Sequence, residues 1–423
     1  MGDPAWSNAY KYCHRYSLAL INSQMIKRLR PLGLLLASVL TLALAISATP
    51  AQAYDKLAPS AIPTVFQTLS DSKFLADPSM ILVDTKTGEV LFERNSTQAR
   101  KPASVIKLLS ATSVLSYIDA QKVFNTNIYL GIDPGTIVIN GEYDPWVSMI
   151  QSQAQKMGRT SLPRLGFNTI NRYKEVTGKK ATRLKILYTG LFPQDLANYQ
   201  AFLKKRGVRT TVEKVTPEDA IMKSADALVL SASPTLETMV KWTLLWSDNV
   251  LAERLARLAA VTSGEPFNTE GVATTFHTVL TNFGIDPDKI EVSDGSGLSK
   301  QNRVTAKAMA DLLMKIRNEP KYASIYDGLP IGGVSGTLQN RFLTTAPQAV
   351  GLVHAKTGTL SGTISLAGYV DSEDRQYIFV AIADKIPRRF SASERARDTL
   401  DRILGKIAAP IFPELVPVPV TTT

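Results

Sequence analysis

Apolar residues recur at helical spacing in several segments of the second half of the chain. The pattern predicts helices over Thr235–Trp246 and Val250–Val261, and two more over Thr305–Ile316 and Ser393–Ala408. A polar tripeptide, Ser247-Asp248-Asn249, separates the first two. We therefore expect this tripeptide to form a loop between two helices, where side chains can point into a cleft.

Short apolar runs bounded by turn residues predict strands near both ends of the chain. Met80–Asp84 and Glu89–Glu93 flank Lys86-Thr87-Gly88, an arrangement typical of a hairpin. Two further strands are predicted at Ser365–Val370 and Gln376–Ala383. These strands and the helices above indicate an α+β core.

Residues 121–224 have a different character from the segments on either side. Between Lys156 and Lys185 there are nine Lys and Arg residues and one acid, Glu175. A strand, a helix and a second strand follow, so the segment is predicted to be an inserted α/β domain. Its predicted elements are strands Thr136–Asn140, Leu184–Tyr188 and Thr210–Val215 and a helix ending at Arg206 before a C-capping Gly207.

The N-terminal region has the pattern of an export signal. Basic residues over Met25–Arg30 precede an apolar run, Leu32–Ile46, and the small residues Ala51-Gln52-Ala53. This order is typical of a secretory signal peptide, and the alternative is a membrane-anchoring helix. Either reading places the protein outside the cytoplasm, in the periplasm or at the cell wall.

These patterns divide the chain into five units. We predict an N-terminal extension with signal peptide (1–53), a first catalytic part (54–120), an inserted domain (121–224), a second catalytic part (225–412) and a Pro/Val/Thr-rich flexible tail (413–423).

Composition removes several kinds of chemistry. The single cysteine, Cys13, precedes the signal segment, which excludes a cysteine nucleophile, and only His277 and His354 remain for a Ser-His-Asp triad or a metal site. We expect neither a metal nor a cofactor. The formal net charge is +11, but no nucleic-acid-binding pattern accompanies it, so anionic cell-wall polymer is the more plausible partner.

The helical pattern over Ala103–Tyr117 carries the first chemical motif. Pro102 stands at its start, so Ser104 lies in the first turn, and Lys107 lies three residues later on the same face. A desolvated lysine beside a serine can accept its proton and make it a nucleophile. Ser70 and Lys73 have the same spacing, but they lie in a polar stretch and favour a surface location.

Two later motifs, together with the first, form an ordered set. Ser247-Asp248-Asn249 offers a hydroxyl and an amide, and Lys356-Thr357-Gly358-Thr359, directly before the Ser365 strand, offers a cation, two hydroxyls and a glycine that permits close approach. A nucleophile at a helix start, a polar loop between helices and a Lys-Thr-Gly before strands, in this order, are typical of the active-site serine penicillin-binding proteins and β-lactamases.

Further stretches resemble one branch of that superfamily. They are Pro102-Ala103-Ser104 leading into Lys107-Leu108-Leu109, Ser247-Asp248-Asn249 leading into Leu251-Ala252-Glu253, Asp294-Gly295-Ser296-Gly297-Leu298-Ser299, and Gly336-Thr337-Leu338 with Arg341-Phe342. With them the chain resembles the D-alanyl-D-alanine carboxypeptidase/endopeptidase family of low-molecular-mass, class C penicillin-binding proteins. That family also has an insertion between the first two motifs.

The resemblance implies a fold and a function. The fold is a penicillin-binding-protein/β-lactamase-like one, with an antiparallel sheet flanked by helices, a helical subdomain and an inserted smaller α/β domain. The implied function is an exported serine DD-peptidase that cleaves the D-Ala-D-Ala end, or the D-Ala cross-links, of peptidoglycan stem peptides and is inhibited covalently by β-lactams. The insertion is shorter and more basic than is usual there, which leaves the number of accessory domains open.

The resemblance also implies a role for each motif residue. Ser104 is acylated, Lys107 takes its proton, Ser247 passes a proton toward the leaving amine, and Asn249 holds the substrate amide. Lys356 supports the Ser247 side. Thr357 and Thr359 bind the terminal carboxylate, Gly358 permits the approach, and the backbone N–H groups of Ser104 and Thr359 form the oxyanion hole.

Two other functions are compatible with the same motifs. A β-lactamase shares the acylation step and differs in how fast water clears the acyl group, and a catalytically idle penicillin-binding or wall-attachment module forms a third class. We expect structural roles for His354, for the loop that begins at Asp294, and for Trp242 and Trp246.

Overall fold

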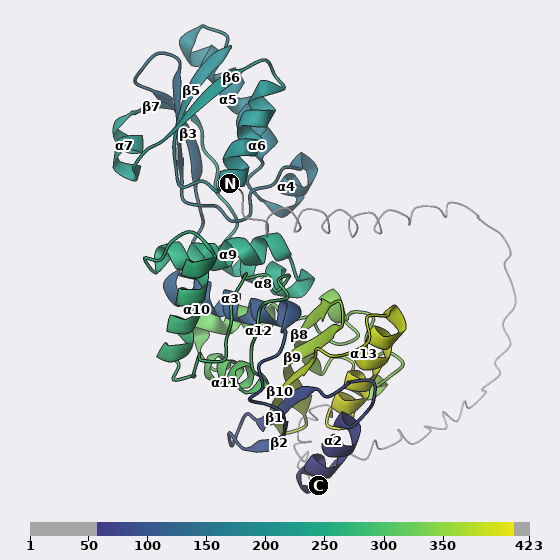
Figure 1. The fold of residues 1–423 in the computed structure, drawn as a ribbon. Helices are drawn as coiled ribbons and strands as arrows, with labels where there is room; N and C mark the ends of the chain where they lie inside the picture. Colours follow the sequence, from purple (N-terminus) through teal and green to yellow (C-terminus); the bar gives the residue numbers. More distant parts are fainter. Residues whose placement is uncertain (1–56, 410–423) are drawn as a thin grey trace, which may run out of the picture.

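The computed structural model describes residues 57–409, so the signal segment and the tail lie outside the described residues. Two bodies are visible in Figure 1, a larger one built around a sheet and a cluster of helices, and a smaller one with a sheet of its own. None of the helices in residues 57–409 is both long and apolar enough to cross a membrane.

The larger body contains a five-stranded sheet in which every neighbouring pair is antiparallel. Its order brings the predicted N-terminal hairpin beside the C-terminal strands, so the two ends of the described chain form one sheet. In sheet order the strands are β2 (Val90–Arg94), β1 (Ser79–Asp84), β10 (Arg375–Ala383), β9 (Thr363–Ser372) and β8 (Val353–Leu360).

Helices cover both faces of this sheet (Figure 1). Helix α3 is buried over Lys107–Leu115, which accounts for its weak amphipathic pattern. On α3's face lie α3 (Lys107–Tyr117), α8 (Leu236–Trp246), α9 (Asn249–Thr262), α10 (Thr269–Asn282), α11 (Ala306–Ile316) and α12 (Ala323–Asp327). On the opposite face lie α2 (Ile62–Ser70) and α13 (Phe390–Gly405). Short 3-10 turns are η1 (Pro59–Ala61), η2 (Ala103–Ile106), η3 (Pro320–Tyr322), η4 (Gly336–Leu338) and η5 (Pro347–Ala349).

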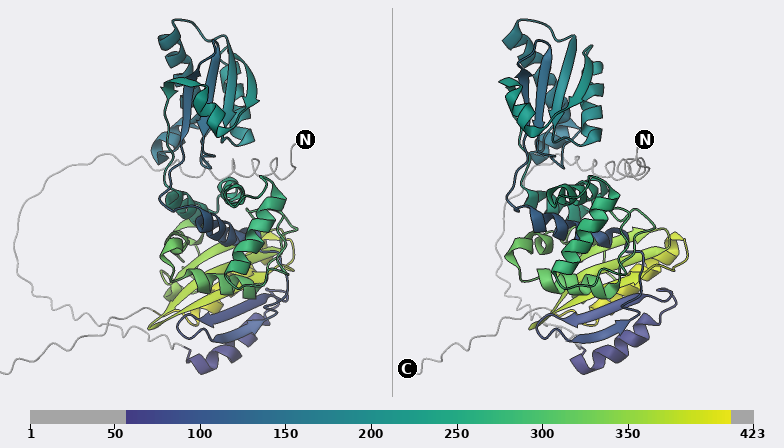
Figure 2. Two further views of the ribbon diagram at one scale, coloured as in Figure 1. Left: turned by 90° about the vertical axis from the view of Figure 1, so that its left-hand side faces the viewer. Right: turned by 60° about the vertical axis from the view of Figure 1, so that its left-hand side comes forward.

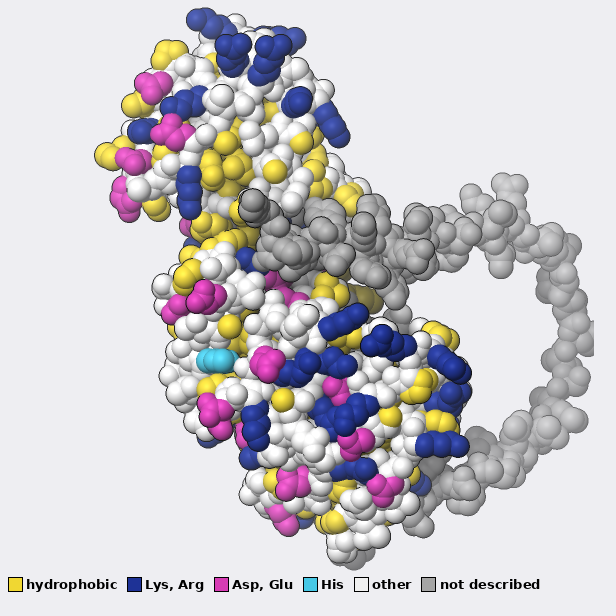
Figure 3. Space-filling view, in the orientation of Figure 1, with side chains coloured by type: hydrophobic (Ala, Val, Ile, Leu, Met, Phe, Trp, Pro, Cys, Tyr) yellow, Lys and Arg dark blue, Asp and Glu magenta, His cyan; other side chains and the backbone are white. Residues whose placement is uncertain are grey.

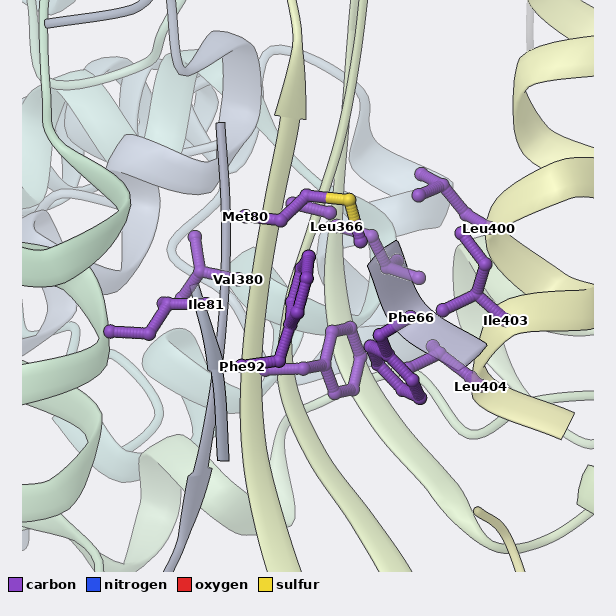
Figure 4. A pocket seen from close by; sticks show the side chains of 11 residues that line it. Phe66, Met80, Ile81, Phe92, Leu366, Val380, Leu400, Ile403 and Leu404 are labelled. Carbon is purple, nitrogen blue, oxygen red and sulfur yellow. The ribbon is translucent and has the colours of Figure 1, made fainter. Parts of the chain in front are cut away.

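Apolar side chains fill the space between the sheet and its second helical layer. Figure 4 shows Met80, Phe92 and Leu366 pointing from the strands toward side chains of α2 and α13. The rings of Phe66 and Phe92 pack with their centroids 5.7 Å apart. The small gap that remains has a wholly apolar lining, as expected of core packing and not of a substrate site.

The smaller body is a mixed five-stranded sheet with its own apolar core. Strands β4, β5 and β6 run parallel, and β3 pairs antiparallel with both β4 and β7. In sheet order the strands are β6 (Arg209–Lys214), β5 (Arg183–Thr189), β4 (Thr136–Gly141), β3 (Thr126–Gly131) and β7 (Ser224–Val229). The helices are α4 (Gln151–Met157), α5 (Leu162–Thr177), α6 (Pro193–Lys204) and α7 (Pro217–Met222).

The α+β class with an inserted α/β body is confirmed, and the predicted β-α-β unit corresponds to β5, α6 and β6. Gly207, after α6, has a φ of 79°, as its expected capping position requires. The second sheet extends to Val229, whereas the division of the chain into five units stays a prediction. Below, the body formed by β3 to β7 is called the inserted domain.

The inserted domain stands at one end of the molecule, next to α9 (Figure 2). At this junction Arg254 of α9 donates a hydrogen bond from Nη2 to Asp195 Oδ1 at 2.7 Å, and both side chains are buried. The Arg254 guanidinium also lies over the ring of Phe192, 4.7 Å from its centroid. The helix that follows the Ser247 loop is therefore in direct contact with the inserted domain.

Candidate active site

Ser104 is presented by a turn that is fixed on both sides. It lies in η2, which leads directly into α3, so the predicted helix begins as a 3-10 turn. The preceding Ala103 has a φ of 48°, which lies in the left-handed region. This backbone conformation is unfavourable for any residue that has a side chain. The Ser365 hydroxyl donates to the Pro102 carbonyl at 2.6 Å and ties the turn to β9. The strained backbone is thus held in place by the sheet.

Lys107 lies one turn beyond Ser104 and is completely buried. Its Nζ is 2.8 Å from Ser104 Oγ and 2.7 Å from Asn249 Oδ1, and it also donates to the Ser296 carbonyl. The amide oxygen and the peptide carbonyl can only accept hydrogen bonds. In the neutral amine, the two N–H bonds are therefore directed to these two oxygens, and the lone pair faces the Ser104 hydroxyl.

Burial favours that neutral form. It lowers the pKa of Lys107 from 10.5 to about 7, although nearby carboxylates, of which Asp294 acts most strongly, favour the charged form. The main cause is thus complete desolvation of the amine. Near neutral pH a substantial fraction of Lys107 is able to accept a proton.

The Ser247 loop lies between two helices, as predicted. Ser247 ends α8 in the left-handed conformation, with a φ of 57°, and Asp248 caps α9 by accepting from the Leu251 N–H at 3.0 Å. The left-handed Ser247 and the Asp248 cap together turn the chain sharply between the two helices. As a result the Ser247 hydroxyl faces Lys356 and the Asn249 amide faces Lys107.

Lys356 reaches this loop from β8. Its Nζ donates to Ser247 Oγ and to the Thr357 carbonyl, both at 2.8 Å, and the side chain is fully buried. Burial lowers its pKa well below the usual value, and the charge of Lys107 adds to this effect. Each of the two serines, Ser104 and Ser247, therefore lies within hydrogen-bond distance of a buried lysine.

The rest of the Lys-Thr-Gly-Thr motif lies along β8 at the edge of the sheet. The side chain of Thr357 is partly exposed and that of Thr359 is exposed. Gly358 packs so closely on the Ser104 turn that an added Cβ would lie 2.0 Å from Ser365 Oγ and 2.8 Å from the Pro102 carbonyl. Only glycine lets β8 approach the serine turn this closely. The structure thus brings all eight predicted site residues together beside Ser104.

The loop that begins at Asp294 is more than the structural turn expected from the sequence. Its Ser296 carbonyl is one of the acceptors for Lys107. Buried Asp294 accepts from the Ser296 N–H at 2.8 Å and from the Ser296 hydroxyl at 3.0 Å, which fixes this carbonyl. Gly297 has a φ of 85°, and a Cβ there would lie 2.1 Å from the Ala103 carbonyl. The loop therefore supports both Lys107 and the Ser104 turn.

Glu253 also has a role that could not be predicted from the sequence. It lies one turn after Asn249 on α9 and accepts from the Gly295 N–H at 2.7 Å and from Arg257 Nε at 2.8 Å. Burial raises its pKa. In the sequence, the Leu251-Ala252-Glu253 stretch indicates only the family resemblance. The structure gives Glu253 a task, which is to join α9 to the Asp294 loop.

The remaining candidates lie elsewhere. Ser70 is buried at the end of α2, where its hydroxyl donates to the Gln67 carbonyl at 2.9 Å, so the expected surface location is wrong for its side chain. His354 stacks on Tyr326 with ring centroids 5.0 Å apart. Trp242 packs against Trp146 and Trp246. Within residues 57–409 no group of three or more His, Cys, Asp or Glu is placed to hold a metal ion.

This geometry suits acyl transfer to a hydroxyl. Ser104 faces a buried amine, Ser247 and Lys356 form a second serine–lysine pair, and two threonine hydroxyls follow along an edge strand.

Comparison with known proteins gives this arrangement a family. Residues 171–407 match the model of the D-Ala-D-Ala carboxypeptidase 3 (S13) family, and residues 67–163 match a model described as D-alanyl-D-alanine carboxypeptidase. Carboxypeptidase DacB of Mycolicibacterium smegmatis is 28% identical over 364 residues, which cover 73% of this chain and 78% of that protein. A D-alanyl-D-alanine carboxypeptidase of an Actinomadura strain is 32% identical over 162 residues, covering 37% of this chain and 30% of that protein.

Solved structures share the fold. Penicillin-binding protein 4 of Haemophilus influenzae superposes with a TM-score of 0.62 at 17% identity, covering 80% of this chain and 98% of that chain. Bd3459, a predatory peptidoglycan endopeptidase of Bdellovibrio bacteriovorus, gives 0.55 at 15% identity, covering 81% and 96%. Because the S13 model spans more than half of the sequence, the chain belongs to the D-Ala-D-Ala carboxypeptidase family S13 and is a serine peptidase of that family.

Proposed function

We propose that the protein releases the terminal D-Ala of peptidoglycan stem peptides through an acyl-enzyme on Ser104. The observation that carries the proposal is the placement of Lys107. Its Nζ lies 2.8 Å from Ser104 Oγ, while its other two polar neighbours, the Asn249 amide oxygen and the Ser296 carbonyl, accept hydrogen bonds and cannot give a proton. A neutral Lys107 is thus oriented as the base for Ser104.

In the acylation step the Ser104 oxygen attacks the carbonyl carbon of the penultimate D-Ala as its proton moves to Lys107. The negative charge that develops on the carbonyl oxygen needs donors, and we assign these to the backbone N–H groups of Ser104 and Thr359. Removing one such donor typically slows catalysis by about 100 to 1000-fold. The close packing of Gly358 on the serine turn supports this assignment because it brings β8 beside Ser104.

The tetrahedral intermediate collapses when the leaving amine receives a proton. We assign this transfer to Ser247, whose hydroxyl lies 2.8 Å from Lys356 Nζ and can be replenished from it. Asn249 holds the substrate amide, and Thr357 and Thr359 receive the terminal carboxylate. Water then attacks the acyl-enzyme in the reverse sense, and Ser104 is regenerated.

The same site is suited to react with a β-lactam, which presents a strained carbonyl and a carboxylate. One structure of Haemophilus influenzae penicillin-binding protein 4 is a complex with a β-lactam. The test is intact-mass analysis after incubation with benzylpenicillin. We expect one covalent adduct on the wild type and on Ser70→Ala, and none on Ser104→Ala. An adduct that persists on Ser104→Ala would overturn the assignment.

We further propose that the enzyme works outside the cytoplasm, in the periplasm or at the wall. The basic and apolar segments between Met25 and Ala53 support this location, either as a cleaved signal peptide or as a retained anchor. Substrate chemistry agrees, since stem peptides of peptidoglycan are found there.

A charged surface supports anionic wall polymer as a second partner. Figure 3 shows Lys and Arg side chains gathered at the end of the inserted domain that is farther from α9. Exposed cations from the ends of α5 and α6 and the starts of β5 and β6 converge there. We call it the distal basic surface, and it consists of Arg172, Lys174, Lys179, Lys180, Arg183, Lys204, Lys205, Arg206 and Arg209.

The structure strengthens the charge argument because the second cationic cluster, after α6, is separate in sequence from the first. Such a concentration of like charge is unfavourable in isolation and attracts polyanions in a salt-dependent way. We propose that this surface binds anionic polymer of the wall and thereby keeps the enzyme near its substrate, without taking part in the chemistry.

A further inference from the structure

The proposed carboxylate-binding edge of the site, formed by Thr357 and Thr359, has a third member that comes from a different element. Arg397, on α13, donates from Nη2 to Thr359 Oγ1 at 3.2 Å. Helix α13 packs on the face of the sheet opposite to α3, and Figure 1 shows it beside β8 and β9. A quarter of the Arg397 side chain is exposed. The guanidinium therefore reaches a hydroxyl of the Lys-Thr-Gly-Thr motif on the edge strand.

The contact with Arg397 determines whether the Thr359 hydroxyl donates or accepts. A guanidinium has donors and no acceptor, so the Thr359 oxygen must accept from Arg397. A hydroxyl has one proton of its own, and that proton then remains to be donated to a third group. Arg397 thus leaves Thr359 with a proton that it can donate to a bound ligand.

A second hydroxyl pair stands beside the first. Thr337, in η4, lies 2.8 Å from Thr357, oxygen to oxygen. One of the two protons is shared between them, and the other remains available, whichever hydroxyl donates. The Thr359 hydroxyl and the Thr337–Thr357 pair therefore each keep one proton that these contacts do not use, next to a cation. This combination fits an anion, and a planar carboxylate with two acceptor oxygens matches it best.

The elements that carry these groups are joined by a buried ion pair. Arg341, a few residues after Thr337, donates to both carboxylate oxygens of Asp401 on α13, and its Nη2 also donates to the Arg397 carbonyl at 3.2 Å. The Asp401 side chain is only 3% exposed. The loop that follows η4 is therefore joined to the helix that carries Arg397.

One acidic group faces Arg397. Glu394, one turn earlier on α13, accepts from Nη1 of Arg397, which leaves Nη2 directed to Thr359. This pairing holds the guanidinium on one side and reduces its net charge. We expect the effect on a bound carboxylate to come mainly from the orientation of the Thr359 hydroxyl and less from long-range attraction.

We propose that Arg397 is a positioning and specificity residue that selects substrates whose leaving residue has a free α-carboxylate. The proposal rests on the function given above and narrows its substrate class. A peptide that ends in D-Ala has this group, and so does a cross-linked peptide in which the leaving residue keeps its own carboxylate. A peptide that ends in D-alaninamide lacks it.

The test compares a diacetyl-Lys-D-Ala-D-Ala peptide with the same peptide ending in D-alaninamide. The quantity measured is the ratio of the two kcat/KM values. In Arg397→Gln we expect this ratio to fall about ten-fold, the lower end of what a hydrogen bond to a charged group contributes, because the site is partly open to water. Arg397→Lys, which keeps a cation but lacks the planar fork, should restore part of the ratio.

The matched control is Arg395→Gln. Arg395 is an exposed cation on the same helix whose guanidinium lies over the Phe74 ring, so its loss changes the net charge equally without touching Thr359. The ratio should be unchanged in this variant. A double change, Arg397→Gln with Thr359→Val, should reduce the ratio no further than Thr359→Val alone, because Arg397 acts through that hydroxyl.

Acylation by benzylpenicillin and by its methyl ester separates this inference from the proposed function. If Ser104 reacts with neither compound, the proposed function fails. If both the peptide ratio and the preference for the free acid over the ester are the same in wild type and in a folded Arg397→Gln, the inference about Arg397 is wrong while the function stands. A fall in both preferences supports it.

Discussion

Arg254 of α9 and Asp195 of α6 form a buried ion pair that joins the inserted domain to the helix behind the Ser247 loop, with Nη2 and Oδ1 2.7 Å apart. Burial raises the pKa of Asp195 although the guanidinium opposes this shift. Arg254 lies five residues after Asn249, so any movement of the pair is passed to the helix that carries a proposed site residue.

Breaking this pair from one side should be costly. Arg254→Ala leaves Asp195 buried without its cation, and such losses typically cost about 3 to 5 kcal/mol of unfolding free energy. Denaturant unfolding monitored by tryptophan fluorescence measures this directly. The control is Arg172→Ala, which removes an exposed pair with Glu175 and should change the unfolding free energy by less than about 1 kcal/mol. Similar losses in both variants would show that the junction contributes no more than the surface.

The pKa of Lys107 predicts how the acylation rate depends on pH. The neutral amine is the base, so the rate of acylation by benzylpenicillin should rise as the pH passes through about 7 and level off above it. Lys107→Arg keeps the positive charge but cannot lose its proton in a protein, and should have almost no activity. Substantial acylation in that variant, or a rate that falls between pH 6 and 8, would mean that another group is the base.

The same shift has a consequence for stability. Between about pH 7 and 10.5 the unfolded chain binds a proton at Lys107 that the folded protein does not, so unfolding free energy should rise with pH across this window. Lys107→Met removes the titration. The difference in unfolding free energy between wild type and this variant should therefore shift in favour of the wild type from pH 7 to 9. An unchanged difference would contradict the lowered pKa.

Gly297 tests the Asp294 loop as a support for the nucleophile. In Gly297→Ala the new Cβ meets the Ala103 carbonyl, and the turn before Ser104 must move. Acylation by benzylpenicillin should slow at least 100-fold. Gly284 has a similar left-handed φ of 72° with no atom within 4 Å of an added Cβ, so Gly284→Ala brings the backbone strain without the clash. Equal rates in the two variants would remove the loop from the catalytic argument.

The distal basic surface gives a prediction about localisation on the wall. Replacing Arg172, Lys174, Lys179 and Lys180 by Gln should weaken salt-sensitive sedimentation of the enzyme with purified cell walls. Turnover of a soluble peptide should stay the same, because these residues lie in the inserted domain away from Ser104. Unchanged sedimentation would leave these cations as an ordinary solvated face.

What could be predicted from the sequence was local in character. Asp248 caps a helix through its own neighbour, Leu251, and the periodic apolar residues on both sides of the loop are visible in the chain. Pro102 and Lys107 mark the start of α3 in the same way. The local structure of such motifs is determined by neighbouring residues in the sequence. The eight site residues could therefore be named before their positions were known.

The features that could not be predicted are contacts between residues that lie far apart in the sequence. Ser296 reaches Lys107 across 189 positions and contributes only its carbonyl, which any residue has. Arg397 reaches Thr359 across 38 positions around a sheet edge. In β7 the residues Ser224–Ala227 are largely exposed, so the strand lacks an alternating pattern, and it pairs with β3 through an irregular register. Such features become visible only when the chain is folded.

The fate of the acyl group distinguishes a peptidase from a β-lactamase, because both begin by acylating Ser104. The carboxylates that act on Lys107 are already engaged, since Asp248 caps α9, Glu253 binds the Gly295 N–H, and Asp294 binds its own loop. None of these three is therefore set up to activate a deacylating water.

Deacylation then depends on Lys107 and on water reaching the carbonyl carbon. Once D-Ala has left, water can approach the carbonyl carbon of the acyl group. The ring nitrogen of a penicilloyl ester, in contrast, stays tethered and obstructs the approach of water. We expect repeated release of D-Ala from diacetyl-Lys-D-Ala-D-Ala and slow loss of bound penicillin, followed by intact mass over time. If the purified enzyme hydrolysed benzylpenicillin faster than it released D-Ala, the β-lactamase reading would replace the peptidase one.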